Sequence, residues 1–256
     1  MREFGFLNVS EEKLYIEDIP VIVLTPINAK KDMATIVLYH GWSSNKESQR
    51  MRGFILASVG YRVVMPDAMH HGERDPFDSY GFERGYELWE TVFKSIEEWE
   101  TLISALDKKY GIATDKIGVI GNSMGGITAS GIYTQNDYIK ALVVLNGSMA
   151  WEHTNKTIRD LIDVAMTEES KYIEGKIAKI DPISNTDLIL DRPILLLHGD
   201  SDEVVPVASQ RRFFQYINPK YKDQDKIKFI EYPGLNHLVT TNMMEDSIVF
   251  FNKYIR

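Results

Sequence analysis

A serine stands between two glycines in the pentapeptide GNSMG at 121–125. An apolar stretch over 116–122 leads into it. The pentapeptide is followed by small residues over 126–133, which suit a helix packed closely on a sheet. A serine on such a strand-to-helix turn needs small neighbours because the backbone is strained there. The helix N-terminus behind the serine favours a developing negative charge. The pattern predicts that Ser123 is a nucleophile; the alternative is a structural tight turn.

A serine hydroxyl is a poor nucleophile without a general base. Of the six histidines, His237 is the strongest candidate, because it lies in the turn-rich segment YPGLNH (232–237) after the last apolar strand pattern. We expect this loop at the carboxyl edge of a parallel sheet, the edge at which Ser123 should emerge. The alternative is a loop histidine that caps the final helix.

Two aspartates compete for the role of the acid that orients this base. An apolar segment over 193–199 runs directly into Asp200-Ser201-Asp202. Asp200 stands at the strand end, where it could cap the turn by bonding amides two residues on. Asp202 lies further into the loop, from which its carboxylate could reach toward His237. We expect Asp202 to be the acid and keep Asp200 as the alternative.

Short apolar segments and helical patterns alternate along the chain. The predicted strands are 13–18, 20–26, 34–40, 61–68, 116–122, 141–147, 193–199 and 226–233. From the third onward they are nearly continuous apolar stretches, as expected of parallel strands covered on both faces. The first two are joined too tightly for a crossover, so they should pair antiparallel at one edge. The pattern predicts an α/β class with a mostly parallel, doubly wound sheet.

Three helical patterns have clear boundaries. Residues 44–47 (SNKE) read as a capping box that opens a helix. Apolar residues recur at helical spacing from Trp89 to Leu106, in one long segment that Gly111 closes. The same spacing over 244–255 predicts a C-terminal helix.

The interval between the strands at 141–147 and 193–199 is unusually long. It holds 45 residues from Ser148 to Arg192, where a helix and its loops need roughly 15–20. Two short amphipathic helices fit, with Thr167 as a cap for the second. They would form a lid at about 148–185 over the strand ends, or a surface excursion without a role. The residues placed to cover the strand ends are Met149, Trp151, Ile158 and Leu161.

The chain resembles the α/β-hydrolase superfamily over essentially its whole length. The resemblance rests on His40-Gly41-Trp42, the pentapeptide around Ser123, the segment HGDSDEVVP at 198–206, and His237. The segment PDAMHHGER at 66–74 is similar to the strand-4 loop of small bacterial carboxylesterases of the prolyl-oligopeptidase and dienelactone-hydrolase-like branch. The resemblance implies the α/β-hydrolase fold over a single domain, 1–256, with the chain order Ser, Asp, His.

The same resemblance supports Asp202 as the acid, because the pattern places the acid three residues after Gly199. It also implies that the backbone amides of Trp42 and Met124 form an oxyanion hole. An ordinary glycine turn is the alternative at His40-Gly41-Trp42. The expected substrate-binding residues are His40, Gly41, His71, Met149 and Trp151.

These residues predict a serine carboxylesterase that hydrolyses short- to medium-chain esters through an acyl-enzyme, with no cofactor and no metal. Dienelactone hydrolases use a cysteine, whereas this chain has Ser123, which favours esters. An amidase, peptidase or acyltransferase with the same triad is one alternative, and a non-catalytic binding protein of the same fold is another. His70-His71 with Glu73 and Asp75 could be read as a metal cluster, but adjacent histidines point apart and no further ligand is suitably spaced.

The composition of the 256-residue chain limits the kinds of partner that we expect it to bind. Its 29 Lys and Arg against 37 Asp and Glu give a net charge of −8, which argues against a nucleic-acid partner. It has no cysteine, which excludes disulfides and thiolate metal sites. No apolar run approaches the ~20 residues that span a bilayer, and the first residues show no secretory signal. We expect a cytoplasmic monomer or homodimer that acts on a small-molecule ester, with neither a nucleic-acid nor a membrane partner.

Overall fold

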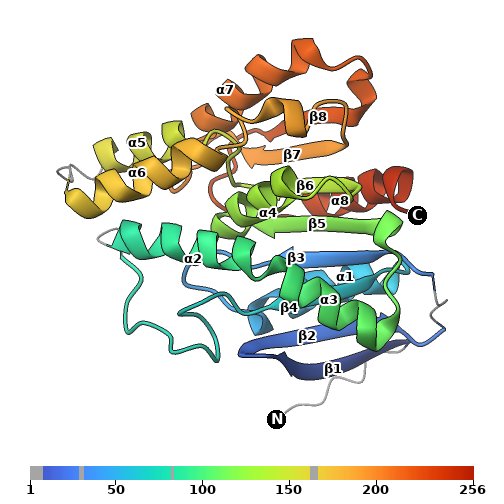
Figure 1. The fold of residues 1–256 in the computed structure, drawn as a ribbon. Helices are drawn as coiled ribbons and strands as arrows, with labels where there is room; N and C mark the ends of the chain where they lie inside the picture. Colours follow the sequence, from blue (N-terminus) through green and yellow to red (C-terminus); the bar gives the residue numbers. More distant parts are fainter. Residues whose placement is uncertain (1–7, 29–31, 82–83, 162–166) are drawn as a thin grey trace.

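An eight-stranded sheet lies at the centre of the fold in the computed structural model, which describes residues 8–28, 32–81, 84–161 and 167–256 (Figure 1). The strands are β1 (Val9–Ile16), β2 (Ile19–Pro26), β3 (Thr35–Tyr39), β4 (Arg62–Pro66), β5 (Ile117–Asn122), β6 (Ala141–Leu145), β7 (Ile194–Gly199) and β8 (Ile227–Tyr232). Their spatial order is β1-β2-β4-β3-β5-β6-β7-β8. The pairs β1–β2 and β2–β4 are antiparallel, and the other pairs are parallel. The eight predicted strands and the antiparallel edge are confirmed.

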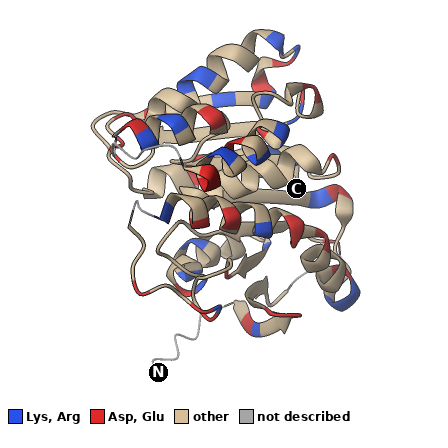
Figure 2. Cartoon of the chain, turned by 60° about the vertical axis from the view of Figure 1, so that its left-hand side comes forward, with Lys and Arg blue, Asp and Glu red and all other residues tan. Residues whose placement is uncertain are grey.

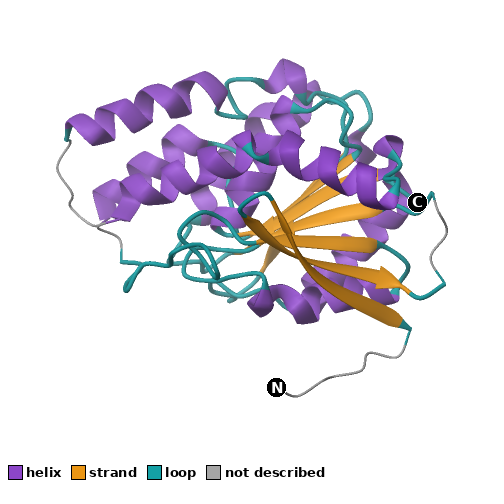
Figure 3. Cartoon of the chain, turned by 60° about the horizontal axis from the view of Figure 1, so that its bottom comes forward, coloured by secondary structure: helices purple, strands orange, loops and turns teal. Residues whose placement is uncertain are grey.

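Helices cover both faces of this sheet (Figure 3). Successive side chains of a strand point to opposite faces, so Ile36 and Leu38 join one apolar core while Val37 and Tyr39 join the other. The face of Val37 is covered by α3 (Trp99–Tyr110), α4 (Met124–Gln135) and α7 (Val207–Ile217). The face of Ile36 is covered by α1 (Arg50–Ser58) and α8 (Thr241–Tyr254). The continuous apolar strands are therefore buried on both sides.

The single long helix predicted over 89–106 is in fact two helices. α2 (Gly85–Glu97) and α3 are separated at Glu98, whose carboxylate receives the Arg74 guanidinium at 2.7 and 3.0 Å. Trp89 of α2 packs in a cluster with α4, α5 and α6, whereas Trp99 of α3 packs against the sheet. Helical spacing continues across Glu98 because both helices present apolar faces inward, so the spacing does not reveal the break. Gly111 closes α3 with φ 64°, as predicted.

The capping box predicted at 44–47 is not formed. The Ser44 amide donates to the Gly41 carbonyl at 3.2 Å, and the Glu47 carboxylate pairs with Lys13. Asn45 takes over the cap, since its Oδ1 accepts hydrogen bonds from the Ser48 amide and hydroxyl at 2.9 and 3.0 Å. The box fails because both of its partners are engaged by residues distant in the sequence or in the preceding turn.

Two helices occupy the long interval after β6, beyond the carboxyl ends of the parallel strands (Figure 1). They are α5 (Trp151–Leu161) and α6 (Glu168–Ile180), and residues 162–166 of the predicted lid, with the side chain of Leu161, lie outside the described part. Thr167 caps α6 as predicted, by accepting from the Ser170 amide at 3.1 Å. The buried Asp181 carboxylate accepts from the amides of Trp151 and Glu152 at 2.9 and 2.8 Å, which ties the start of α5 to the end of α6.

Acidic and basic residues are interspersed along the helices on the side shown in Figure 2. Across the described ranges, no helix combines the length and apolar character needed to cross a bilayer.

Candidate active site

Ser123 lies on a sharp turn between β5 and α4. Its φ of 58° and ψ of −123° place a non-glycine residue in a strained region of backbone space. A Cβ on Gly121 would lie 2.0 Å from the Gly125 carbonyl oxygen, and a Cβ on Gly125 would lie 2.3 Å from the Tyr39 carbonyl oxygen. Neither position has room for a side chain. The glycines of the pentapeptide thus allow the close approach of β5, α4 and β3 that this turn requires.

His237 contacts Asp202 across two loops at the carboxyl edge of the sheet. His237 Nδ1 lies 2.7 Å from Asp202 Oδ2, so the imidazole donates through Nδ1 and its Nε2 is the free basic nitrogen. Asp202 Oδ1 accepts from the amides of Val204 and Val205, at 2.9 Å each. The carboxylate is therefore held from both sides.

A second histidine supports the same carboxylate. The fully buried His198 donates from Nε2 to the Val205 carbonyl at 2.8 Å, and the same nitrogen lies 3.2 Å from Asp202 Oδ2. Burial alone would raise the pKa of Asp202, but the hydrogen bonds with His198 and His237 lower it below its ordinary value. Asp202 is consequently an anion at neutral pH.

Asp200 has different partners from Asp202. Its Oδ1 accepts from the Gly234 amide at 2.7 Å and from the Ser201 hydroxyl at 2.9 Å. The sequence led us to expect a cap on amides two residues on; instead, Asp200 joins the end of β7 to the loop that leads to His237. Of the two aspartates, Asp202 is the one in contact with the imidazole.

Asn146 links the same loops and was not singled out from the sequence. Its side chain is buried, accepts from the Gly199 amide at 3.0 Å and donates to the Leu238 carbonyl at 2.9 Å. The residue adopts a φ of 46°, which asparagine tolerates better than most residues. Its position directly after an apolar strand was the available signal, but the partner carbonyl is 92 residues away in the chain.

Ser123 and His237 line one cavity of about 370 Å³. Trp42 and Met124, the predicted oxyanion residues, line it as well. Its apolar walls come from Leu88, Trp89, Ile127, Ile158, Val204 and Val205. Among the described residues that line it, Arg84 is the only one with a permanent charge. The site thus combines the polar side chains of Ser123 and His237 with an apolar pocket between α2 and α5.

The loop after β3 lies directly against the Ser123 turn. A Cβ on Gly41 would lie 3.2 Å from both the Ser123 Cβ and the Asn122 carbonyl oxygen. Trp42 follows Gly41, and its side chain is fixed because the indole donates to the Tyr80 carbonyl at 3.0 Å. Met124 is the first residue of α4, and the first amides of a helix have no acceptor within the helix. Backbone donors are therefore available beside the serine.

The other predicted substrate-binding residues do not line this cavity, because their side chains are enclosed in the core. His40 is 1% exposed and its Nε2 accepts from the Ala68 amide at 3.0 Å. His71 is buried, which lowers its pKa to about 4, and its Nδ1 donates to the Met69 carbonyl.

Met149 and Trp151 are fully buried, and the Trp151 indole donates to Ser130 Oγ and the Ser148 carbonyl at 3.1 Å each. The chain turns inward after β6 before α5 begins. Of the three residues expected to cover the strand ends whose side chains the structure describes, only Ile158 lines the cavity.

His70 and His71 have separate environments. His70 stacks on Phe77 with ring centroids 4.4 Å apart, whereas His71 packs against Trp42 and Tyr80, which also contact each other. Over the ranges that the structure describes, no group of three or more His, Asp or Glu side chains is arranged to hold a metal ion.

A larger cleft of about 1000 Å³ lies on the other face of α5. It is lined by α5, α6 and α7 and contains none of the predicted catalytic residues. Helix α5 therefore separates two cavities: Ile158 faces the Ser123 cavity, and Lys156 faces the cleft.

A family model, two relatives and a solved structure each match this chain over most of its length. The model of the prolyl oligopeptidase family matches residues 48–255. The chain is 31% identical over 256 residues to YitV of Bacillus subtilis (strain 168), which carries an esterase name, with 95% of this chain and 98% of the relative covered. It is 27% identical over 249 residues to the esterase YjfP of Escherichia coli (strain K12), with 95% and 98% covered. The crystal structure of TT1662 from Thermus thermophilus matches at a TM-score of 0.76 and 19% identity, over 96% of this chain and 98% of that one.

Proposed function

The chain belongs to the prolyl oligopeptidase family and has the α/β-hydrolase fold, and from this membership and the Ser123 cavity we propose that it is a serine carboxylesterase. The substrates are short- to medium-chain carboxylic esters, and the reaction passes through an acyl-enzyme. The observation that carries the proposal is the strained turn that presents Ser123 to the same cavity as a histidine already paired with a buried carboxylate.

In the first half of the reaction, Ser123 Oγ attacks the ester carbonyl carbon while His237 Nε2 takes the hydroxyl proton. Asp202 holds the Nδ1-protonated tautomer and stabilises the imidazolium that forms. The tetrahedral intermediate then collapses, and His237 returns the proton to the departing alkoxide. The products of this half are the alcohol and the acyl ester of Ser123.

In the second half, water attacks the acyl carbonyl while His237 acts again as the base. The second tetrahedral intermediate releases the carboxylic acid and regenerates the Ser123 hydroxyl. In both halves the amides of Trp42 and Met124 donate to the oxyanion, and losing one such donor costs ~3 kcal/mol of transition-state stabilisation.

Cavity volume and composition support the substrate class. A cavity of about 370 Å³ with mostly apolar walls, one of them Ile158 of α5, suits a short or medium acyl chain. The family is described as prolyl oligopeptidase, which favours amide hydrolysis as the second candidate. Both reactions use the same three residues, so the scissile bond must be tested directly.

The test is a series of p-nitrophenyl esters of increasing acyl length, run beside the matched p-nitroanilides. We expect kcat/KM for the esters to exceed that for the anilides with the same acyl group, with the maximum among the short chains. Faster anilide hydrolysis would favour the amidase alternative. The absence both of turnover and of labelling by a fluorophosphonate would indicate a non-catalytic binding protein.

A further inference from the structure

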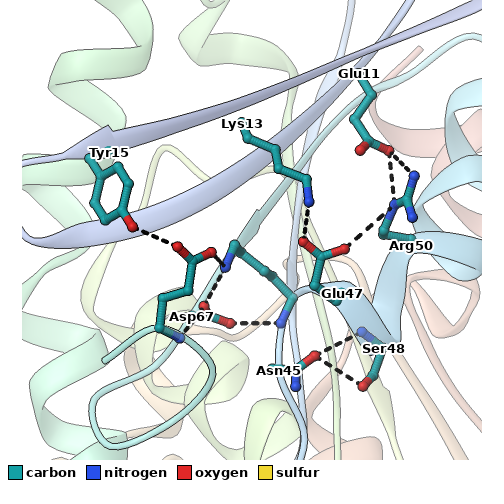
Figure 4. Close-up of polar contacts among 10 residues, drawn as sticks. Glu11, Lys13, Tyr15, Asn45, Glu47, Ser48, Arg50 and Asp67 are labelled. Atoms are coloured by element: carbon teal, nitrogen blue, oxygen red, sulfur yellow. Dashed lines mark hydrogen bonds and ion pairs between the residues drawn. The ribbon is translucent and has the colours of Figure 1, made fainter. Parts of the chain in front are cut away.

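A lysine is almost completely buried beside the predicted oxyanion loop. Lys46 lies four residues after Trp42, and its side chain is 2% exposed. Lysine is almost never buried to this extent without a charged partner. Its partner is Asp67 at the end of β4, whose side chain is fully buried (Figure 4).

The Asp67 carboxylate joins the β3–α1 loop to the β4 loop. Its Oδ1 accepts from the Lys46 amide at 2.8 Å, and its Oδ2 accepts from Lys46 Nζ at 2.6 Å and from the Glu73 amide at 3.1 Å. Lys46 Nζ also pairs with the Glu73 carboxylate, which receives the Tyr15 hydroxyl from β1 at 2.6 Å. Burial alone would lower the pKa of Lys46, but Asp67 and Glu73 raise it above its ordinary value. The lysine is therefore a permanent cation in this cluster.

The β4 loop is shaped around this carboxylate. Gly72 adopts a φ of 58°, and a Cβ there would lie 2.2 Å from Asp67 Oδ2. A glycine is thus needed for the loop to close over the carboxylate. Six residues before Lys46, His40 makes a second connection to the β4 loop, because its Nε2 accepts from the Ala68 amide at 3.0 Å. The loop that carries Trp42 is consequently attached to the β4 loop on both sides of the tryptophan.

Asp67 does not line the Ser123 cavity. It can affect turnover only through the segments that it holds, and the held segment carries the proposed oxyanion amide. An oxyanion donor must lie 2.7–3.1 Å from the developing charge. A misplacement of ~1 Å is enough to cost ~10² in rate. Small movements of the Trp42 loop should therefore act mainly on the transition state.

We propose that Asp67 is a positioning residue for ester hydrolysis, which holds the Trp42 amide in place through the buried Lys46. The proposal rests on the proposed function. It predicts that weakening the Asp67–Lys46 contact lowers kcat and leaves KM nearly unchanged, because substrate binding in the apolar cavity does not depend on the oxyanion donors.

The test uses Asp67→Asn, which keeps the shape of the side chain but has a single acceptor oxygen for three donors. The double variant Lys46→Met/Asp67→Asn removes both charges and guards against a misfolded single variant. The matched control is Lys13→Met. It removes an exposed lysine of β1 that pairs with Glu47, the residue directly after Lys46 (Figure 4). For each variant, kcat and KM are measured on a p-nitrophenyl ester, and kcat is calculated from the concentration of folded protein.

The second readout is the inhibition constant of a trifluoromethyl ketone, whose hemiketal adduct carries an oxyanion. We expect Asp67→Asn and the double variant to lower kcat by ~10- to 100-fold, to weaken the ketone by a similar factor and to change KM less than about two-fold. Lys13→Met should match the wild type. Unchanged kcat and inhibition in the folded variants would overturn the proposal, even if Tm falls. A wild-type protein with neither turnover nor labelling would instead overturn the proposed function, and the proposal with it.

Discussion

At the scale of single residues, Asp200 and Asp202 stand in one loop and have carboxylates with different partners. Asp202 contacts His237, whereas Asp200 bonds the Gly234 amide. We predict that Asp202→Asn folds and cuts kcat by up to ~10⁴, the scale of loss when a triad acid loses its charge. Asp200→Asn should instead cost about 1 kcal/mol of stability. Turnover and Tm of both variants decide between them; a folded Asp200→Asn that is the less active of the two would contradict the assignment.

The pKa of Asp202 determines how turnover depends on pH. Because hydrogen bonds lower this pKa below the usual value, Asp202 stays ionised through the acid range in which an ordinary aspartate takes up a proton. Protonation of the general base, which then cannot accept the proton of Ser123, is the one loss that this leaves on the acid side. We therefore predict that log kcat/KM falls with a slope of one on the acid side, down to a pH of ~4.5. A slope of two in that range would reveal a second titrating carboxylate and contradict the shifted pKa.

Trp42 offers a contrast between a backbone role and a side-chain role. Trp42→Ala keeps the amide, whereas Trp42→Pro removes it. We predict substantial remaining kcat in the alanine variant and a far larger loss in the proline variant. Circular dichroism should establish that both variants are folded before rates are compared. Equal losses in two folded variants would point to the indole, which bonds the Tyr80 carbonyl, in place of the amide.

At the scale of elements, we expect α5 to limit the length of the acyl chain that the cavity accepts. Ile158 lines the Ser123 cavity, and Lys156 lines the cleft on the opposite face of the helix. We predict that the wild type prefers C2–C6 esters and that Ile158→Ala moves the preference toward longer chains, while Lys156→Ala leaves it unchanged. The measurement is kcat/KM across the p-nitrophenyl ester series. Faster hydrolysis of C12–C16 than of C2–C6 esters by the wild type would show that α5 does not close the pocket.

The elements also show what apolar spacing can and cannot predict. Strand positions were predictable because nearly continuous apolar segments can be buried only within a covered sheet. The break at Glu98 was not, since the spacing continues through it and the Glu98 carboxylate bonds Arg74, 24 residues away in the chain. The Asn45 cap was missed for a similar reason: Lys13 engages Glu47 from β1. Local patterns predict the elements, and contacts distant in sequence adjust their ends.

At the scale of the whole molecule, the order of the strands brings distant residues to one edge of the sheet. Ser123 follows β5, Asp202 follows β7 and His237 follows β8, and all three strands run parallel. Their meeting at one edge was predictable from the chain order and the resemblance. The burial of Met149, Trp151 and His71 was not, because a sequence pattern does not show whether a loop turns inward or outward after its strand.

The proposed function requires that Ser123 is the nucleophile of an ester hydrolase. The most direct test is reaction with a fluorophosphonate, followed by intact-protein and peptide mass spectrometry, on the wild type and on Ser123→Ala. We predict one adduct, located on Ser123, in the wild type. Ser123→Ala should give no adduct, retain less than a few per cent of ester turnover and show a nearly unchanged Tm, because a single hydroxyl at the cavity surface is removed. An adduct on another residue, or greater turnover in Ser123→Ala, would show that Ser123 is not the nucleophile.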